Sequence, residues 1–248
     1  MNERSDLRSE VTHRAQEIAH DVQEHVEAVV DAVKPHLRGW LHAVMAPLAL
    51  IGGIVLIGLA PTQGGRIAAM VFTITAGLLF TVSALYHRGK WSPRADGVLR
   101  RLDHANIFLI IAGSYTPFAL LLPRSEAITL LVIVWTGAIG GVLFRVLWLG
   151  APRWLYVPIY LALGWVAVFY IKPLLTHGGW TIMAFVIAGG LFYSLGALVY
   201  GLKKPNPSPR WFGFHEIFHT FTILAFTSHF IAAALALFGP VAASSAAN

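Results

Sequence analysis

The chain has 248 residues, of which 56% are hydrophobic and only 12% are charged, and its mean hydropathy is +0.66. A soluble domain carries about a quarter charged residues, so this composition excludes an ordinary soluble protein. The absence of cysteine excludes disulfides and thiolate metal sites, and a transition-metal site must therefore use His, Asp or Glu. The net charge of +6 could suit an acidic partner such as nucleic acid, but its distribution along the chain indicates membrane topology instead, and we expect no nucleic-acid partner.

The first 36 residues differ from the rest of the chain. Apolar residues such as Leu7, Val11, Ile18 and Val22 recur every three or four positions between charged ones, and this spacing predicts an amphipathic cytoplasmic helix. We see no signal peptide, because the segment has no short apolar core. Acidic residues outnumber basic ones, which disfavours attachment to anionic lipid. We expect the apolar stripe to pack on the bundle or on a second copy of the chain, as a homo-oligomer.

From residue 37 onward the apolar residues fall in runs of about 20, the length that a helix needs to cross a bilayer. Uninterrupted apolar runs fit helices rather than the alternating pattern of a barrel. The sequence therefore predicts an all-α membrane protein, with a seven-transmembrane-helix bundle over residues 37–240 and a disordered tail at 241–248. The expected spans are Leu41–Ala60, Ile67–Tyr86, Asp103–Leu122, Ala127–Leu149, Leu155–Pro173, Trp180–Tyr200 and His215–Phe238.

The basic residues indicate the orientation of these spans. All but three of the 18 Lys and Arg residues lie in the N-terminal segment or in every second connection after it; the exceptions are Arg66, Arg124 and Lys172. Because cytoplasmic loops carry the excess of Lys and Arg, we expect the N-terminus in the cytoplasm and the C-terminus outside. The expected location is the inner (plasma) membrane of the cell.

Several ionisable residues lie within or beside these spans, where they are costly and mark working sites. His87 ends the second span and Asp103 begins the third, while His215 and His219 begin the seventh. The topology places all four at cytoplasmic helix ends. Residues four apart share a helix face, so His215 and His219 project together, as do Ser83 and His87. The sequence predicts that three imidazoles converge, with a carboxylate and a hydroxyl nearby.

Three histidines and an exchangeable water form a catalytic type of zinc site, and zinc lowers the pKa of its bound water toward about 7. Asp103 would accept a proton from that water or orient it. Ser83 would hydrogen-bond the water or a developing oxyanion. Histidines near helix ends can also simply lie at the membrane interface, and we interpret His42 in that way.

The segment His215-Glu216-Ile217-Phe218-His219 is also a literal H-E-x-x-H sequence. In many metalloproteases this sequence forms the zinc-binding helix and its Glu is the general base. An intramembrane metalloprotease is therefore a competing hypothesis. It gives no role to Ser83, His87 or Asp103.

Four short stretches carry a resemblance to a known family: Ser-Ala-Leu-Tyr-His at 83–87, Leu-Asp-His-Ala-Asn-Ile at 102–107, Gly-Ser-Tyr-Thr-Pro at 113–117 and His-Glu-Ile-Phe-His at 215–219. Their order and spacing resemble the bacterial hemolysin III proteins, which belong with the progestin and adipoQ receptor family and are more distantly similar to alkaline ceramidases. The resemblance covers about residues 40–240.

This resemblance implies a seven-helix fold with a cytoplasmic N-terminus and a zinc ion near the cytoplasmic face. Carried over to this chain, it implies that His87, His215 and His219 are the zinc ligands. It further implies that Asp103 and Ser83 surround the bound water.

Four functions stay open from the sequence, and with them the question of whether the chain is an enzyme. The first is a zinc-dependent hydrolase of an amide or ester bond in a lipid that enters from the bilayer. The second is a receptor-like or membrane-homeostasis protein with structural zinc. The third is the protease, and the fourth is a membrane-lysing toxin, which only the family name suggests.

Overall fold

The computed structural model describes residues 13–14, 16–18, 22, 35–148 and 150–239, and in this part the chain is all-helical. Residues from Leu37 onward form one compact unit, and residues up to His36 form another. Five helical segments are long and apolar enough to cross a membrane: Trp40–Leu59, Gln63–Arg88, Arg124–Leu147, Arg153–Leu202 and Phe214–Phe238. The chain is therefore a multi-pass membrane protein, as the composition predicts.

The expected N-terminal amphipathic helix and the expected tail fall mostly or wholly outside the described residues. The N-terminal residues that are described are helical, and His13 Nδ1 lies 3.4 Å from Glu17 Oε1, one turn away. The packing of the apolar stripe on a bundle or on a second copy stays a prediction.

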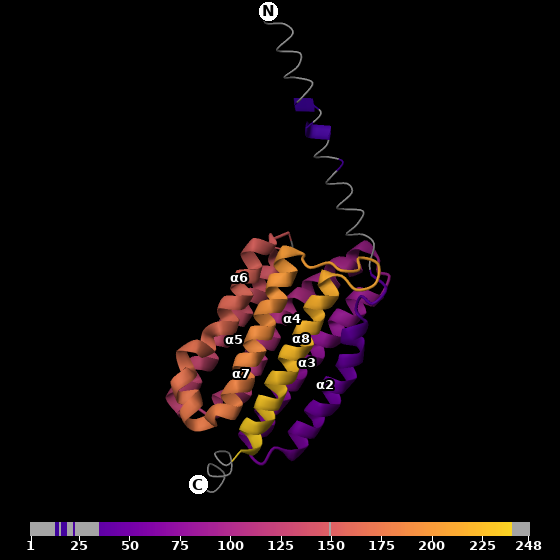
Figure 1. Cartoon of the computed structure of the whole chain (residues 1–248). Coiled ribbons are helices and arrows are strands. Elements are labelled where there is room, and N and C mark those ends of the chain that lie inside the picture. Colours follow the sequence, from indigo (N-terminus) through magenta and orange to yellow (C-terminus); the bar gives the residue numbers. More distant parts are fainter. Residues whose placement is uncertain (1–12, 15, 19–21, 23–34, 149, 240–248) are drawn as a thin grey trace, which may run out of the picture. The chain divides into compact units, whose positions relative to one another are not determined.

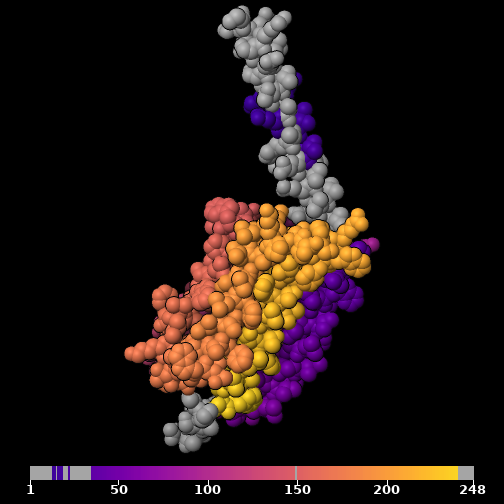
Figure 2. Space-filling view, viewed as in Figure 1, coloured from indigo at the N-terminus to yellow at the C-terminus, as the bar shows by residue number. Residues whose placement is uncertain are grey.

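The second unit is a bundle of helices that run along one another (Figure 1). In the space-filling view α8 lies between α7 and α2, so the last helix of the chain contacts the first helix of the bundle (Figure 2). The elements are α2 (Trp40–Leu59), α3 (Gln63–Arg88), α4 (Pro93–Ala119), α5 (Arg124–Leu147), α6 (Arg153–Gly164), the 3₁₀ helix η1 (Trp165–Tyr170), α7 (Ile171–Leu202) and α8 (Phe214–Phe238).

The helix that contains Asp103 begins before the third expected span, because α4 starts at Pro93 and Asp103 lies about three turns into it. Local capping explains the early start. The Ser92 hydroxyl accepts a hydrogen bond from the Ala95 N–H at 3.4 Å, proline is preorganised for the first helical position, and Asp96 in the first turn favours the helix N-terminus. The apolar run shows where the apolar stretch begins, but the helix begins at its cap.

The fifth and sixth expected spans form one helical run of 50 residues across α6, η1 and α7. Gly179 interrupts this run with φ 75° and ψ 174°, a conformation that glycine adopts far more readily than other residues. Tyr156 Oη lies 3.1 Å from Tyr200 Oη, and the Trp165 indole donates to the Ser194 hydroxyl at 2.9 Å. The parts of the run before and after Gly179 therefore lie antiparallel and side by side.

Small residues allow close packing of α5 on its neighbours. A Cβ added to Gly141 would collide with the ring of Phe108, a fully buried side chain of α4. Gly140, the preceding residue, is exposed, and a Cβ there would meet nothing within 4 Å. Adjacent glycines on the same helix thus have different roles.

We predict that Gly141→Ala lowers the stability of the bundle by about 1–3 kcal/mol, because it overpacks the contact with Phe108. The matched variant Gly140→Ala should be neutral or slightly stabilising, since alanine is the better helix former by about 0.5–1 kcal/mol. Thermal unfolding of the detergent-purified chain measures both. Equal effects of the two substitutions would contradict the packing described here.

Candidate metal centre

Three histidine side chains from two helices meet inside the bundle. His87 lies in the last turn of α3, and His215 and His219 lie one turn apart at the start of α8. One ligand atom from each ring lies within 4.8 Å of the other two. Nε2 of His87 lies 3.1 Å from Nε2 of His215, close to the separation of about 3.3 Å expected for two nitrogens about 2.0–2.1 Å from one tetrahedral zinc ion. The cluster can therefore hold a metal ion.

The expected carboxylate and hydroxyl lie beside this cluster. Asp103 Oδ2 is 3.7 Å from His87 Nε2, and Ser83, one turn before His87, is buried next to the Asp103 carboxylate. Ser83, Asp103 and His219 also line one small cavity. The structure thus brings together all five residues that the sequence singles out.

Glu216, the acid of the H-E-x-x-H sequence, is buried and has two partners of its own. Its Oε1 accepts a hydrogen bond from Arg38 Nε at 3.0 Å, and its Oε2 accepts one from the Gly213 N–H at 2.8 Å. The second bond caps the N-terminus of α8, and the first joins α8 to the residues just before α2. Glu216 therefore acts as a structural tie, and a protease base at this position would have to give up both bonds.

His42 of α2 is a fourth histidine of the site, and the interfacial interpretation did not anticipate its burial. Its ring stacks on that of His219 with 3.7 Å between centroids and 13° between planes. Neither of its ring nitrogens has a hydrogen-bond partner in the described chain, and it lines the small cavity with Ser83 and Asp103. The available signal was its place inside the first apolar stretch, Leu41–Ala60, where an ionisable side chain is costly.

His104 lies next to Asp103 in sequence but faces a different part of the bundle. Its Nδ1 donates to the Arg100 carbonyl at 2.8 Å, because a carbonyl can only accept. Its Nε2 must then accept the hydrogen bond from the Tyr200 hydroxyl, 3.3 Å away on α7. His104 is therefore engaged with α7 rather than with the three-histidine cluster.

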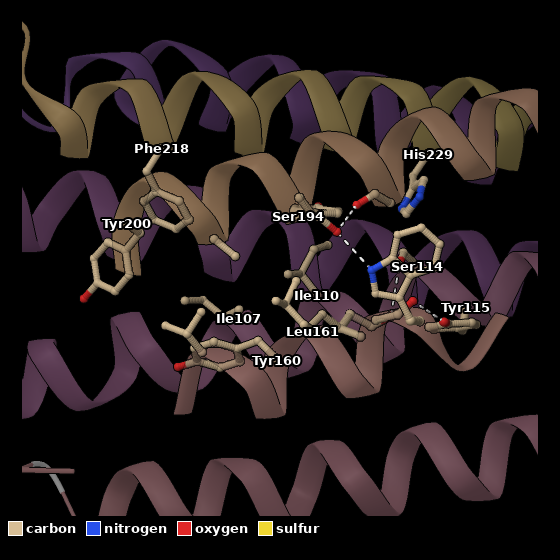
Figure 3. A pocket seen from close by; sticks show the side chains of 17 residues that line it. Ile107, Ile110, Ser114, Tyr115, Tyr160, Leu161, Ser194, Tyr200, Phe218 and His229 are labelled. Carbon is tan, nitrogen blue, oxygen red and sulfur yellow. Dashed lines mark hydrogen bonds between the residues drawn. The ribbon is translucent and has the colours of Figure 1, made fainter. Parts of the chain in front are cut away.

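A larger cavity lies between α4, α6, α7 and α8 and encloses about 750 Å³ of empty space, part of it open to the surroundings (Figure 3). Its walls are mainly aliphatic and aromatic. Four residues line both this cavity and the small one beside the histidines, namely Ile107, Ile110, Tyr193 and Phe218. The two cavities therefore share part of their walls, and an apolar space lies near the candidate metal centre.

Known proteins are similar in sequence to the part of the chain that forms the bundle. A family model described as haemolysin-III related matches residues 30–230. The chain is 34% identical to hemolysin-3 of Bacillus cereus over 189 residues, which cover 73% of this chain and 82% of that protein. It is 31% identical to a hemolysin-3 homolog of Bacillus subtilis over 186 residues, 73% of this chain and 84% of the relative. Human monocyte to macrophage differentiation factor is 24% identical over 198 residues, 78% of this chain and 80% of the relative.

We predict that Arg38→Met destabilises the chain by about 3–5 kcal/mol, because it leaves the buried Glu216 carboxylate without its cation. Glu216→Gln should cost less, since the amide oxygen still accepts from the Gly213 N–H. Thermal unfolding and metal content measure the effect, with Glu126→Gln, at a partly exposed acid in the first turn of α5, as a control. If Arg38→Met were as stable as the control, the ion pair between Arg38 and Glu216 would make no contribution to the stability of the bundle.

Proposed function

Because the chain belongs to the haemolysin-III related family of integral membrane proteins, we propose that it is a zinc-dependent hydrolase that cleaves an amide or ester bond of a membrane lipid. One observation carries the proposal. Three imidazoles, a carboxylate and a hydroxyl surround a single point, and an apolar cavity adjoins that point.

In this proposal His87, His215 and His219 hold the ion. Bound zinc supplies a Lewis acid and lowers the pKa of a coordinated water. Asp103 accepts the proton of the attacking water and delivers it to the leaving amine or alcohol, because its carboxylate is the acid–base group beside the cluster. The Ser83 hydroxyl donates a hydrogen bond to the oxyanion that develops on the substrate carbonyl.

The adjoining cavities support a lipid as the substrate. An acyl chain needs a long apolar space, and the larger cavity supplies one between α4, α6, α7 and α8. The small cavity lined by Asp103 and His219 shares walls with it, such as Ile107 and Phe218, so an acyl chain bound there would lie close to these two residues. A water-soluble substrate would gain little binding free energy from contact with such apolar walls.

The proposed topology has seven spans. These are α2, α3, α4, α5, the parts of the long helical run before and after Gly179, and α8. The distribution of Lys and Arg supports a cytoplasmic N-terminus, an outside C-terminus and a zinc site near the cytoplasmic face of the inner (plasma) membrane.

A receptor-like or membrane-homeostasis protein with structural zinc is the second candidate, and the placement of the ligands favours it. His87 comes from α3 while His215 and His219 come from α8, so an ion bound to all three would tie these helices together. The protease is less well supported, because both carboxylate oxygens of Glu216 are already hydrogen-bonded.

We predict that the purified chain with zinc releases fatty acid from at least one member of a panel of ceramides and glycerolipids. His87→Ala should abolish both zinc binding and release. Ser83→Ala and Asp103→Asn should retain zinc and slow release by about 10²-fold or more, while Thr81→Ala, exposed on the same helix, should have no effect. Metal analysis and chromatography of the released acid measure these outcomes.

Two results would decide against a zinc-dependent hydrolase. Release that survives complete chelation of zinc would show that the metal does not carry the chemistry. No release from any lipid, together with a large loss of thermal stability in His87→Ala, would favour the structural role.

We predict that the two ends of the chain lie on opposite sides of the membrane. Since the chain has no cysteine, Ser5→Cys and Ser244→Cys each introduce a single thiol. In right-side-out vesicles an impermeant maleimide should label the second variant directly and the first only after permeabilisation. Labelling of both from the same side would contradict an odd number of spans.

A further inference from the structure

The ring of His42, the one histidine of α2, lies flat against a candidate metal ligand. The ring centres of His42 and His219 are 3.7 Å apart, and the two planes differ by 13°. Three other rings beside His219 are tilted from it by 53–63°; they belong to His87, His215 and Phe218. Among the ring contacts of the described helices, His42 is therefore the one that covers a face of His219.

The stacked geometry excludes His42 as a fourth ligand of the same ion. An imidazole binds a metal through a nitrogen lone pair that lies in the plane of its ring. Two nearly parallel rings with centres 3.7 Å apart direct their lone pairs along separate planes, so both cannot point at one ion about 2.0–2.1 Å away. The nitrogens that do come together belong to His87, His215 and His219. The contact between His42 and the metal centre is therefore the stack itself.

The His219 ring lacks the hydrogen bond that usually orients a metal-binding histidine. Such a histidine almost always donates its second ring N–H to a carboxylate, a carbonyl or water, and this bond fixes the orientation of the ring. His219 Nδ1 is buried and has no hydrogen-bond partner among the residues that the structure describes. The orientation of the ring must then come from packing, and the flat face of His42 supplies it.

His42 is itself held between the two helices that carry the ligands. Phe80 of α3 meets the His42 ring edge-on, with 5.1 Å between centroids and 81° between planes. Phe80 is fully buried and packs in the same edge-on manner against Phe226 of α8. Since the His42 side chain is only 2% exposed, these contacts keep its ring against His219. In this way α2, which supplies none of the three ligands, contributes to the geometry of the site.

Metal binding makes the stack more favourable than it is without the ion. A zinc-bound imidazole carries part of the charge of the ion, and a cation is attracted to the face of an aromatic ring, most strongly where water is excluded. The contact between His42 and His219 lies inside the bundle, where both side chains are 2% exposed. The stack therefore stabilises the metal-bound chain relative to the metal-free chain, so it contributes to metal affinity as well as to packing.

We propose that His42 is a positioning residue for the metal: its ring orients the ligand His219 in place of a hydrogen bond and raises the affinity of the site for zinc. The inference rests on the proposal that His87, His215 and His219 hold zinc, but it does not depend on turnover. The ring nitrogens of His42, which have no partner in the described chain, take no part in this role. They make the side chain polar where it lines the small cavity.

The test uses the full-length chain in detergent, with zinc affinity measured by competition with a chelator. His42→Leu should weaken zinc binding about 10–100-fold, the usual cost of losing a group that orients a metal-binding histidine. His42→Phe should bind zinc within about threefold of the unaltered chain, because a phenyl ring offers the same flat face. The control is Leu56→Ala, at a buried residue about 21 Å further along α2. It should lower thermal stability and leave zinc affinity unchanged.

Cobalt(II) in place of zinc supplies a readout that loss of packing alone would not change. The visible absorption bands of bound cobalt(II) depend on the number and the arrangement of its ligands. We expect His42→Leu to shift these bands, because His219 is free to turn. His42→Phe and Leu56→Ala should keep the bands of the unaltered chain.

Equal zinc affinity of His42→Leu and the unaltered chain would overturn the inference. A folded His42→Phe that lost zinc as fully as His42→Leu would also overturn it, because the nitrogens rather than the ring would then be responsible. Should His42→Phe fail to fold, His42→Asn decides. It keeps a polar side chain without a ring and should lose zinc as His42→Leu does, so unchanged affinity would contradict the stacking role. If the unaltered chain bound no zinc, both proposals would be wrong, whereas zinc binding that is indifferent to His42 overturns this inference alone.

Discussion

The cost of burying a charged side chain without a partner determines how several helices of this bundle meet. A charge left unpaired in an apolar interior costs several kcal/mol. Arg38 and Glu216 join the start of α2 to α8, Asp103 and His87 join α4 to α3, and the Asn106 amide donates to a carbonyl of α3 at 3.1 Å. The candidate metal centre lies where these pairs meet, so the contacts that orient the helices also assemble the site.

Much of the helical architecture and the position of the site could be predicted from the sequence, because both depend on local properties. Apolar runs of membrane length predict helices wherever they occur, and four of the expected spans agree with α2, α3, α5 and α8 to within a few residues. Successive spans cross the membrane in opposite directions, which places His87 and Asp103 at the same end of the bundle as His215 and His219. The spacing of four residues between the last two then predicts that their side chains project together.

Other features depend on contacts between residues far apart in the sequence, and periodicity carries no information on them. Arg38 and Glu216 are separated by 178 residues. The H-E-x-x-H motif alone therefore could not show that the Glu216 carboxylate is hydrogen-bonded to Arg38. The stacking of His42 on His219 is of the same kind. The early start of α4 has a different cause, since a cap at Ser92 extends the helix beyond its apolar stretch.

The contact between α2 and α8 has a consequence for biosynthesis. Chains are made from the N-terminus, and N-terminal segments enter the fold first, whereas the residues that complete this centre arrive with the last helix. Until α8 emerges from the ribosome, Arg38 has no Glu216 and His42 has no ring to stack on. The nascent bundle must therefore hold several polar side chains in the membrane without their final partners, and a ribosome that stops before residue 215 yields helices without a metal site.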